Sequence, residues 1–166
     1  MKYFYLKQKV FSFADKYKVY DEQQQIAYYC QGKMFSLSHK MNFLSGKTDQ
    51  IIYRFQKKLF TFMPEYHIYD TKDQLVATVK KQFTLLSKKL HVTGHQIDYH
   101  VEGNFYAHSF GVLDGQSELA SIRKKYFSWG DSYEISISDD INEAFMLALV
   151  ILIDSIFHNE SKRHHH

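Results

Sequence analysis

The sequence contains few of the residues that mark secreted or fibrous proteins. Its 166 residues include one cysteine, one proline and seven glycines. Cys30 has no partner for an internal disulfide, which fits a reducing cytoplasm. Apolar residues make up 45% of the chain and charged residues 23%, which are ordinary values for a folded soluble protein. We therefore do not expect a disordered, collagen-like or coiled-coil chain.

Targeting and membrane-spanning patterns are also missing. The opening residues from Met1 to Lys7 contain no uninterrupted apolar stretch, so no signal peptide is expected. The apolar run near the C-terminus, residues 144–153, has ten residues, whereas a bilayer span needs about 20. These features predict a cytoplasmic protein.

Charge and motifs exclude several functional classes. The net charge of +3 is too small to indicate nucleic-acid binding by itself. The chain has no glycine-rich phosphate loop, no Gly-x-Ser-x-Gly motif, no His-Glu-x-x-His motif and no paired cysteines. Cys30 follows two tyrosines in an apolar stretch, which indicates a small core residue. We expect neither an enzyme nor a cofactor.

Histidines are the only candidates for a metal site. His91, His95, His100 and His108 lie close in the sequence, with Asp98 among them, and we expect His100 and His108 on neighbouring strands. Surface or cross-strand histidines are the commoner explanation, so no metal site is expected. Residues 164–166 are all histidine and read as the remnant of a purification tag, and residues 161–163 are a vector or linker candidate.

An internal repeat predicts β-hairpins. The chain has 13 Tyr, 14 Phe and one Trp, residue types that favour strands. Residues 17–21, 66–70 and 110–114 share the pattern aromatic, any residue, β-branched, apolar, Asp. In each copy an apolar pair begins five residues after the Asp, which is the signature of a strand, a turn and a second strand. Chance similarity in a tyrosine-rich sequence is the alternative explanation.

The repeat also predicts the number of strands. Two weaker turns fall at residues 45–49 and 93–95, so five hairpins supply ten strands. Further strands at about 3–13 and 132–138 bring the total to about twelve. No linker or change of composition divides the chain. We therefore predict one domain over residues 1–160 and a tail at 161–166.

The C-terminal segment predicts a buried helix over about residues 141–158. Asp140 and Glu143 have the spacing of a capping box. The ten apolar residues that follow leave no polar face, so the helix must be buried on all sides. A barrel of about twelve strands has room for a helix about 10 Å across. The predicted fold is an all-β, closed antiparallel barrel around this helix, with Asp154 reaching solvent or pairing with a lysine.

The residues from Ile122 to Ile135, which include the run Phe-Ser-Trp-Gly-Asp, resemble the signature of the LURP-one-related family. The opening strand around Lys7–Phe13 and the apolar terminal helix are similar to that family too. The resemblance implies the tubby C-terminal-like fold, a twelve-stranded barrel around a central helix. It implies no settled activity, although tubby domains bind phosphoinositides and phospholipid scramblases act on membranes. No tubby lipid-binding residue is matched here.

Alternate turns of an antiparallel meander lie at opposite ends of the barrel. The aspartates at 21, 49, 70, 114, 139 and 140 would then share one end. The intervening turns, with Lys16 after the first strand, would carry the basic residues of the other end. These candidate lipid-binding residues are Lys33, Lys57, Lys58, Lys80, Lys81, Arg123, Lys124 and Lys125.

The basic end has two interpretations. It can bind anionic membrane lipid head groups and hold the protein peripherally at a membrane, since each Lys or Arg near an anionic surface contributes about 1 kcal/mol. Alternatively, the lysines solubilise turns and complement the helix dipole. On the second interpretation the protein is a structural or protein-interaction scaffold without a small-molecule ligand. The sequence identifies no protein partner and gives no reason to expect nucleic acid.

Overall fold

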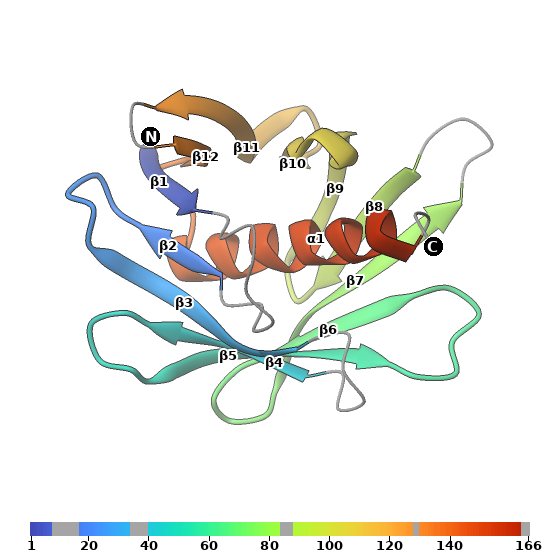
Figure 1. Ribbon diagram of the computed structural model, residues 1–166. Coiled ribbons are helices and arrows are strands. Elements are labelled where there is room, and N and C mark those ends of the chain that lie inside the picture. Colours follow the sequence, from blue (N-terminus) through green and yellow to red (C-terminus); the bar gives the residue numbers. More distant parts are fainter. Residues whose placement is uncertain (8–16, 34–39, 84–87, 128–129, 164–166) are drawn as a thin grey trace.

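Twelve strands surround one long helix in the computed structural model, which describes residues 1–7, 17–33, 40–83, 88–127 and 130–163. Each strand pairs antiparallel with its neighbours in the sequence, and β1 pairs with both β2 and β12 to close the barrel (Figure 1). The predicted closed antiparallel barrel around a C-terminal helix is confirmed.

The elements follow one another as a simple meander. They are β1 (Lys2–Lys7), β2 (Lys18–Tyr20), β3 (Ile26–Lys33), β4 (Lys40–Ser45), β5 (Ile51–Lys58), β6 (Glu65–Tyr69), β7 (Leu75–Phe83), β8 (Lys88–Gly94), β9 (Ile97–Asn104), the 3-10 helix η1 (Phe105–Ala107), β10 (Ser109–Asp114), β11 (Ser117–Phe127), β12 (Gly130–Ile137) and α1 (Glu143–Arg163). The five predicted hairpins are confirmed over these residues, as β2–β3, β4–β5, β6–β7, β8–β9 and β10–β11. Residues 8–13 of the first predicted strand, and Trp129, lie outside the described residues.

The repeated aspartates shape the turns. Asp70 Oδ1 accepts hydrogen bonds from the backbone N–H groups of Lys72 (2.8 Å) and Gln74 (2.9 Å). Asp21 Oδ1 accepts one from the Gln25 N–H at the corresponding position (2.8 Å). An Asp side chain that satisfies turn N–H groups in this way favours a tight reversal of the chain. The repeat is therefore a folding signal of the hairpins.

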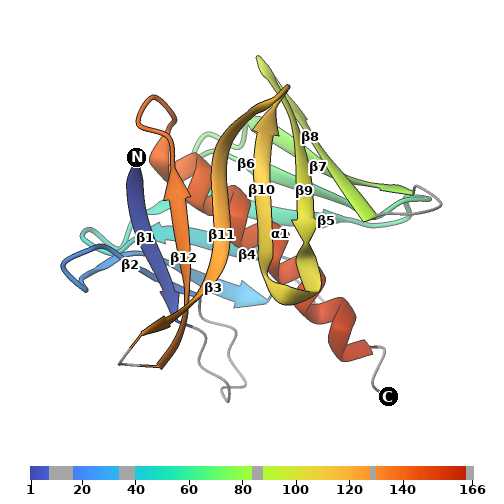
Figure 2. The ribbon, with the colours of Figure 1, turned by 90° about the horizontal axis from the view of Figure 1, so that it is seen from above.

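Helix α1 runs through the inside of the barrel (Figure 2). Every side chain from Met146 to Ile153 is inaccessible to solvent. The inward faces of the strands supply the surrounding apolar side chains, among them Phe43, Phe55, Ile68, Val92, Ile122 and Ile135. Burial of each large apolar side chain contributes roughly 1.5–3 kcal/mol as an upper estimate, so the helix and the barrel wall stabilise each other.

The start of the helix differs from the prediction. The Asn142 side chain, and not that of Asp140, caps α1, because Asn142 Oδ1 accepts a hydrogen bond from the Phe145 N–H at 3.0 Å. The first helical backbone bond, from the Met146 N–H to the Asn142 carbonyl, also identifies Asn142 as the N-cap. The sequence pattern predicts the cap two residues too early, because both Asp140 and Asn142 are good capping residues.

The helix also ends later than the predicted residue 158, because its backbone remains helical to Arg163. No helix in the described segments is long and apolar enough to cross a bilayer.

Cys30 on β3 is fully buried, as predicted for a small core residue. Burial raises the pKa of its thiol, which therefore stays protonated at neutral pH.

The capping assignment predicts that Asn142→Ala destabilises the protein by about 1 kcal/mol, which lowers Tm by roughly 2–4 °C. The matched variant Asp140→Ala removes the exposed carboxylate that was the alternative cap, and it should leave Tm nearly unchanged. Thermal unfolding followed by circular dichroism compares the two. A larger loss in Asp140→Ala than in Asn142→Ala contradicts the assignment.

Burial of the helix predicts that Leu149→Asp prevents folding. Leu149 is fully buried in the apolar run of α1, and an unpaired carboxylate there costs several kcal/mol, a large part of the 5–15 kcal/mol that typically stabilises a domain. The control Leu75→Asp adds the same charge at a side chain that is 52% exposed and should fold normally. A soluble Leu149→Asp protein with a native circular dichroism spectrum contradicts a buried helix.

Candidate functional site

The barrel has two chemically different ends. The acidic end, which appears at the top and left of Figure 2, carries the polar turns 21–25, 46–50, 70–74 and 114–117 and the β12–α1 connection. The basic end carries the β5–β6 loop of residues 59–64 and η1. Helix α1 starts at the acidic end and leaves the barrel at the basic end (Figure 2).

The predicted basic residues lie within strands and not in the turns where we expected them. Lys57 and Lys58 are the last residues of β5, and Lys80 and Lys81 lie inside β7. Arg123, Lys124 and Lys125 lie inside β11, and Lys33 ends β3 with its side chain outside those described. Lys80, Lys81 and the basic residues of β11 lie in strands because β7 and β11 are longer than expected and continue to pair as far as Phe83 and Phe127. Lys16 lies outside the described residues.

The structure separates the predicted basic residues into groups. Lys57, Lys58, Lys80 and Lys81 belong to β5 and β7, which both pair with β6. The three basic residues of β11 lie farther around the barrel, because β8, β9 and β10 separate that strand from β7. Lys33 on β3 is separated from β5 by β4. One compact group on β5 and β7, which we call the β5–β7 lysine cluster, is therefore the strongest candidate site.

Strand alternation divides this cluster between two faces. Lys58 and Lys80 are exposed on the outer surface of the barrel. Lys57 and Lys81 share the inward faces of their strands with Phe55 and Val79, at the mouth of the barrel. Lys81 Nζ lies 5.2 Å from the ring centroid of Phe157 near the exit of α1. That position favours a cation–π contact and places positive charge near the C-terminal half of the helix.

One carboxylate compensates the outer lysines in part. Glu65 lies 3.6 Å from Lys58 Nζ and 3.4 Å from Lys80 Nζ. The hydrogen bond with His67, at 2.6 Å, and the neighbouring lysines lower the pKa of Glu65, so this carboxylate stays charged. Residues 57–67 and 79–83 together contain four lysines and one acidic residue, which leaves a positive surplus. The Glu65 side chain is largely covered, but the side chains of Lys58 and Lys80 are about half exposed, so solvent screens these ion pairs and the lysines stay accessible to a further anion.

Two of the three basic residues of β11 each have a separate carboxylate partner. Lys125 Nζ lies 3.3 Å from Glu134, and an Arg123 guanidinium nitrogen lies 3.7 Å from Glu118. Each therefore faces its own carboxylate on the outer wall of the barrel. These contacts suit stabilisation of the sheet better than capture of an anion.

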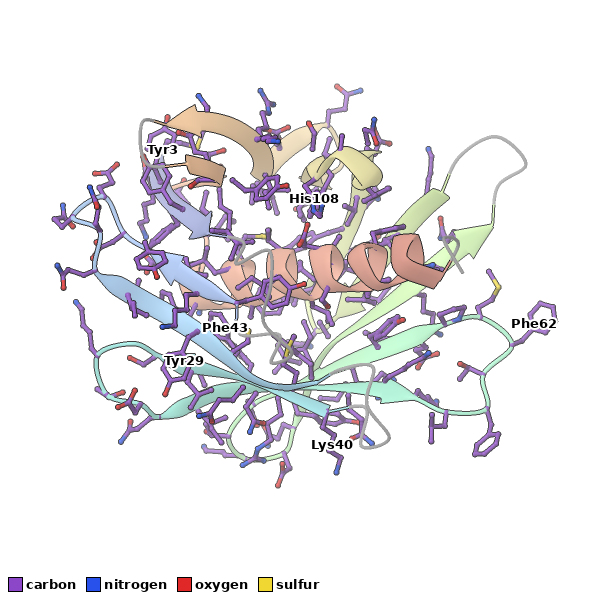
Figure 3. The ribbon with its side chains drawn as sticks, in the orientation of Figure 1. Tyr3, Tyr29, Lys40, Phe43, Phe62 and His108 are labelled. Atoms are coloured by element: carbon purple, nitrogen blue, oxygen red, sulfur yellow. The ribbon has the colours of Figure 1, made fainter. Side chains whose placement is uncertain are left out.

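Sequence reasoning missed the apolar β5–β6 loop. Its residues are Leu59, Phe60, Thr61, Phe62, Met63 and Pro64. The Phe60 and Phe62 side chains are fully exposed, and Leu59 is 51% exposed. Figure 3 shows Phe62 pointing away from the barrel. The signal that could have indicated this loop is an apolar connection between two strands that directly follows Lys57 and Lys58. This connection also contains the only proline of the chain.

A buried His–Asp pair was also missed. Asp154 is only 2% exposed and forms a hydrogen bond with His108, which Figure 3 places between η1 and α1. The expectation that Asp154 reaches solvent is wrong, and its ion-pair partner among the described residues is a histidine and not the expected lysine. His108 adopts a left-handed backbone conformation with φ of 50° after η1, and its ring centroid lies 4.8 Å from that of Tyr133. The pair joins the helix to the barrel wall.

The charge of this pair is set by its surroundings. The hydrogen bond to Asp154 raises the pKa of His108 above its ordinary 6.5, and this effect outweighs the opposing effects of burial and of Lys124. Next to the pair, Phe105 of η1 stacks on Phe157 of α1 with ring centroids 4.1 Å apart. The contact of η1 with α1 is thus partly ionic and partly aromatic.

The other histidines do not form a metal site in the described part of the chain, where no group of three His, Cys, Asp or Glu side chains is placed to hold a metal ion. His91 pairs with Asp98 across β8 and β9, with Nε2 and Oδ1 2.5 Å apart. His100 lies on β9 opposite His91 and Leu113, whereas His108 follows η1 and directly precedes β10, the neighbour of β9, so His108 lies just outside the strand on which it was expected.

The His108–Asp154 pair predicts a pH dependence of stability. Because folding raises the pKa of His108, the folded protein holds this proton more tightly than the unfolded chain does. The stabilisation is fully present below pH 6.5 and is lost as pH rises through the folded-state pKa. Thermal unfolding between pH 5.5 and 9 should therefore show a falling Tm that the variant His108→Gln makes flatter.

The matched control is His95→Gln, at an exposed position of the β8–β9 turn, which should keep the wild-type slope. Equal slopes of Tm against pH in the wild type and in His108→Gln contradict the proposed linkage.

Comparisons with known proteins agree with the fold. A family model described as LURP-one-related matches residues 2–154. The chain is 31% identical over 158 residues to the uncharacterized protein YxjI of Bacillus subtilis (strain 168), covering 94% of each chain. The X-ray structure of a protein from Arabidopsis thaliana has a TM-score of 0.67 and 17% identity, covering 93% of this chain and 90% of that one, which shows a shared fold. The resemblance in residues 122–135 is thereby confirmed, and the chain belongs to the LURP-one-related family.

Proposed function

We propose that this protein is a non-enzymatic binding module that contacts anionic membrane lipid head groups through the basic end of its barrel. The protein then acts peripherally, at the surface of a membrane facing the cytoplasm. The observation that carries this proposal is the β5–β7 lysine cluster, in which Lys58 and Lys80 share one carboxylate, Glu65, on the outer surface, while Lys57 and Lys81 lie at the mouth of the barrel.

The magnitude of the attraction is sufficient for reversible binding. Each lysine near an anionic leaflet contributes about 1 kcal/mol, so four lysines contribute roughly 4 kcal/mol, or about a thousandfold in partitioning. The attraction falls off within a Debye length of about 10 Å at 0.1 M salt. Binding by this mechanism must therefore weaken steeply as the salt concentration rises.

The proposal predicts that Lys58→Gln/Lys80→Gln weakens binding to anionic vesicles roughly 30-fold, because two contributions of about 1 kcal/mol are lost. Both side chains are exposed, so the barrel should remain folded. The measurement is co-sedimentation of tag-free protein with phosphatidylcholine vesicles that contain none or 30% phosphatidylserine, at low and high salt. The tag must be removed because histidines also bind acidic surfaces.

The matched control is Lys47→Gln/Lys72→Gln, which removes the same charge from exposed turns of the acidic end. This variant should bind as the wild type does. The variant Lys57→Glu/Lys58→Glu/Lys80→Glu/Lys81→Glu should abolish binding. Absence of vesicle binding by the wild type at either salt concentration, or equal weakening by the two double variants, contradicts the proposal and favours a protein-interaction scaffold.

A further inference from the structure

We propose that the β5–β6 loop inserts Phe60 and Phe62 into the interfacial layer of an anionic bilayer, while Lys58 and Lys80 stay among the head groups. This inference rests on the proposed function and adds an apolar anchor to it. We call residues Leu59–Met63 the aromatic loop. The partner that we propose for the aromatic loop is a lipid surface.

The exposure of the aromatic loop is the first observation. Phe60 and Phe62 are fully exposed and Leu59 is half exposed, so three large apolar side chains within four residues face solvent. Single exposed apolar residues are common on protein surfaces, whereas a contiguous exposed group marks a contact with a partner or a membrane. Aromatic side chains are also enriched where proteins meet the membrane–water interface.

The loop is held in a defined position. Lys58 and Glu65 form the last residue pair between β5 and β6, directly at the base of the loop. The Lys81 N–H donates a hydrogen bond of 3.3 Å to the Pro64 carbonyl, which ties the loop to β7. Phe60 has a φ of 58°, a conformation that is rare for a bulky residue. Backbone strain of this kind, kept in a loop whose aromatic rings contact nothing, indicates a role outside the isolated protein.

Charge identifies the partner. Lys58 and Lys80 flank the apolar tip, and Lys57 and Lys81 stand behind it at the barrel mouth. An apolar tip surrounded by cations matches a bilayer surface, in which phosphates lie above the acyl boundary. A second copy of this chain placed tip to tip would bring the same lysines against each other. Charge complementarity therefore favours anionic lipid over self-association.

The opposite end lacks this combination. Its turns at residues 21–25 and 70–74 consist of Asp, Glu, Gln, Thr and Lys. The large apolar side chains exposed there include Leu75, at the start of β7 and 52% exposed, and Met1, which is 60% exposed beside Asp139. An apolar tip with flanking lysines thus distinguishes the basic end from the acidic end among the described connections, and Leu75 provides an internal control.

Co-sedimentation tests the apolar contribution. Phe60→Ala/Phe62→Ala should weaken binding to vesicles with 30% phosphatidylserine roughly tenfold or more, because the apolar area buried in the membrane is lost. The residual binding should keep its salt dependence, since the lysines are unchanged. Leu75→Ala should bind as the wild type does. Equal binding by Phe60→Ala/Phe62→Ala and the wild type overturns the inference.

Fluorescence tests insertion directly. Phe60→Cys can be labelled with the environment-sensitive dye NBD, because the native Cys30 is buried and its thiol pKa is raised. On anionic vesicles the NBD emission should shift to the blue, gain intensity and be quenched by lipids carrying a spin label near the acyl boundary. The control Leu75→Cys, labelled in the same way, should not respond.

The results distinguish insertion of the aromatic loop from binding of lipid head groups by the lysines alone. Salt-sensitive binding by the wild type together with an unchanged NBD signal at position 60 overturns insertion and leaves head-group binding standing. Absence of wild-type binding overturns both. Self-association that is lost in Phe60→Ala/Phe62→Ala, without vesicle binding, assigns the aromatic loop to a second copy and overturns the lipid assignment.

Discussion

Burial of an all-apolar helix is the constraint on which the rest of the structure depends. From Met146 to Ile153 no side chain of α1 reaches solvent, so the helix can exist only inside a continuous apolar wall. The alternating inward residues of the strands supply that wall. Closure of the sheet through the β1–β12 pair also removes the exposed strand edges that would otherwise invite aggregation.

An apolar cylinder alone does not fix the rotation or depth of a helix. Two polar contacts supply this information here. Near the acidic end, the Tyr28 hydroxyl donates a 2.8 Å hydrogen bond to Glu143 in the first turn of α1. Eleven residues later, or about 17 Å along the helix axis, Asp154 pairs with His108 of the wall. Partly buried polar pairs of this kind set the register of the helix more than they add stability, and they hold the helix exit at the basic end.

The fold followed from local signals, whereas the site did not. Turn aspartates, strand alternation and the apolar run each act within a few residues, so the hairpins and the helix could be predicted from sequence. The lengths of β7 and β11 could not, because lysines tolerate exposed strand positions as well as turns. The His108–Asp154 pair joins residues 46 apart, and no periodicity reports a contact of that kind. The apolar residues of the aromatic loop are visible in the sequence, but an apolar hairpin loop has the same composition as a continuing strand, so its exposure could not be predicted.

In the function that we propose, the basic end is the membrane-facing surface of a polarised barrel. Hydrogen exchange of the free and vesicle-bound protein tests this orientation most directly, since it reports every backbone segment at once. On anionic vesicles, we expect slower exchange in residues 57–65 and around Lys80 and Lys81, with the turns at 21–25 and 70–74 unchanged. Bound protein whose protection appears at the acidic-end turns, and not at residues 57–65, would contradict it.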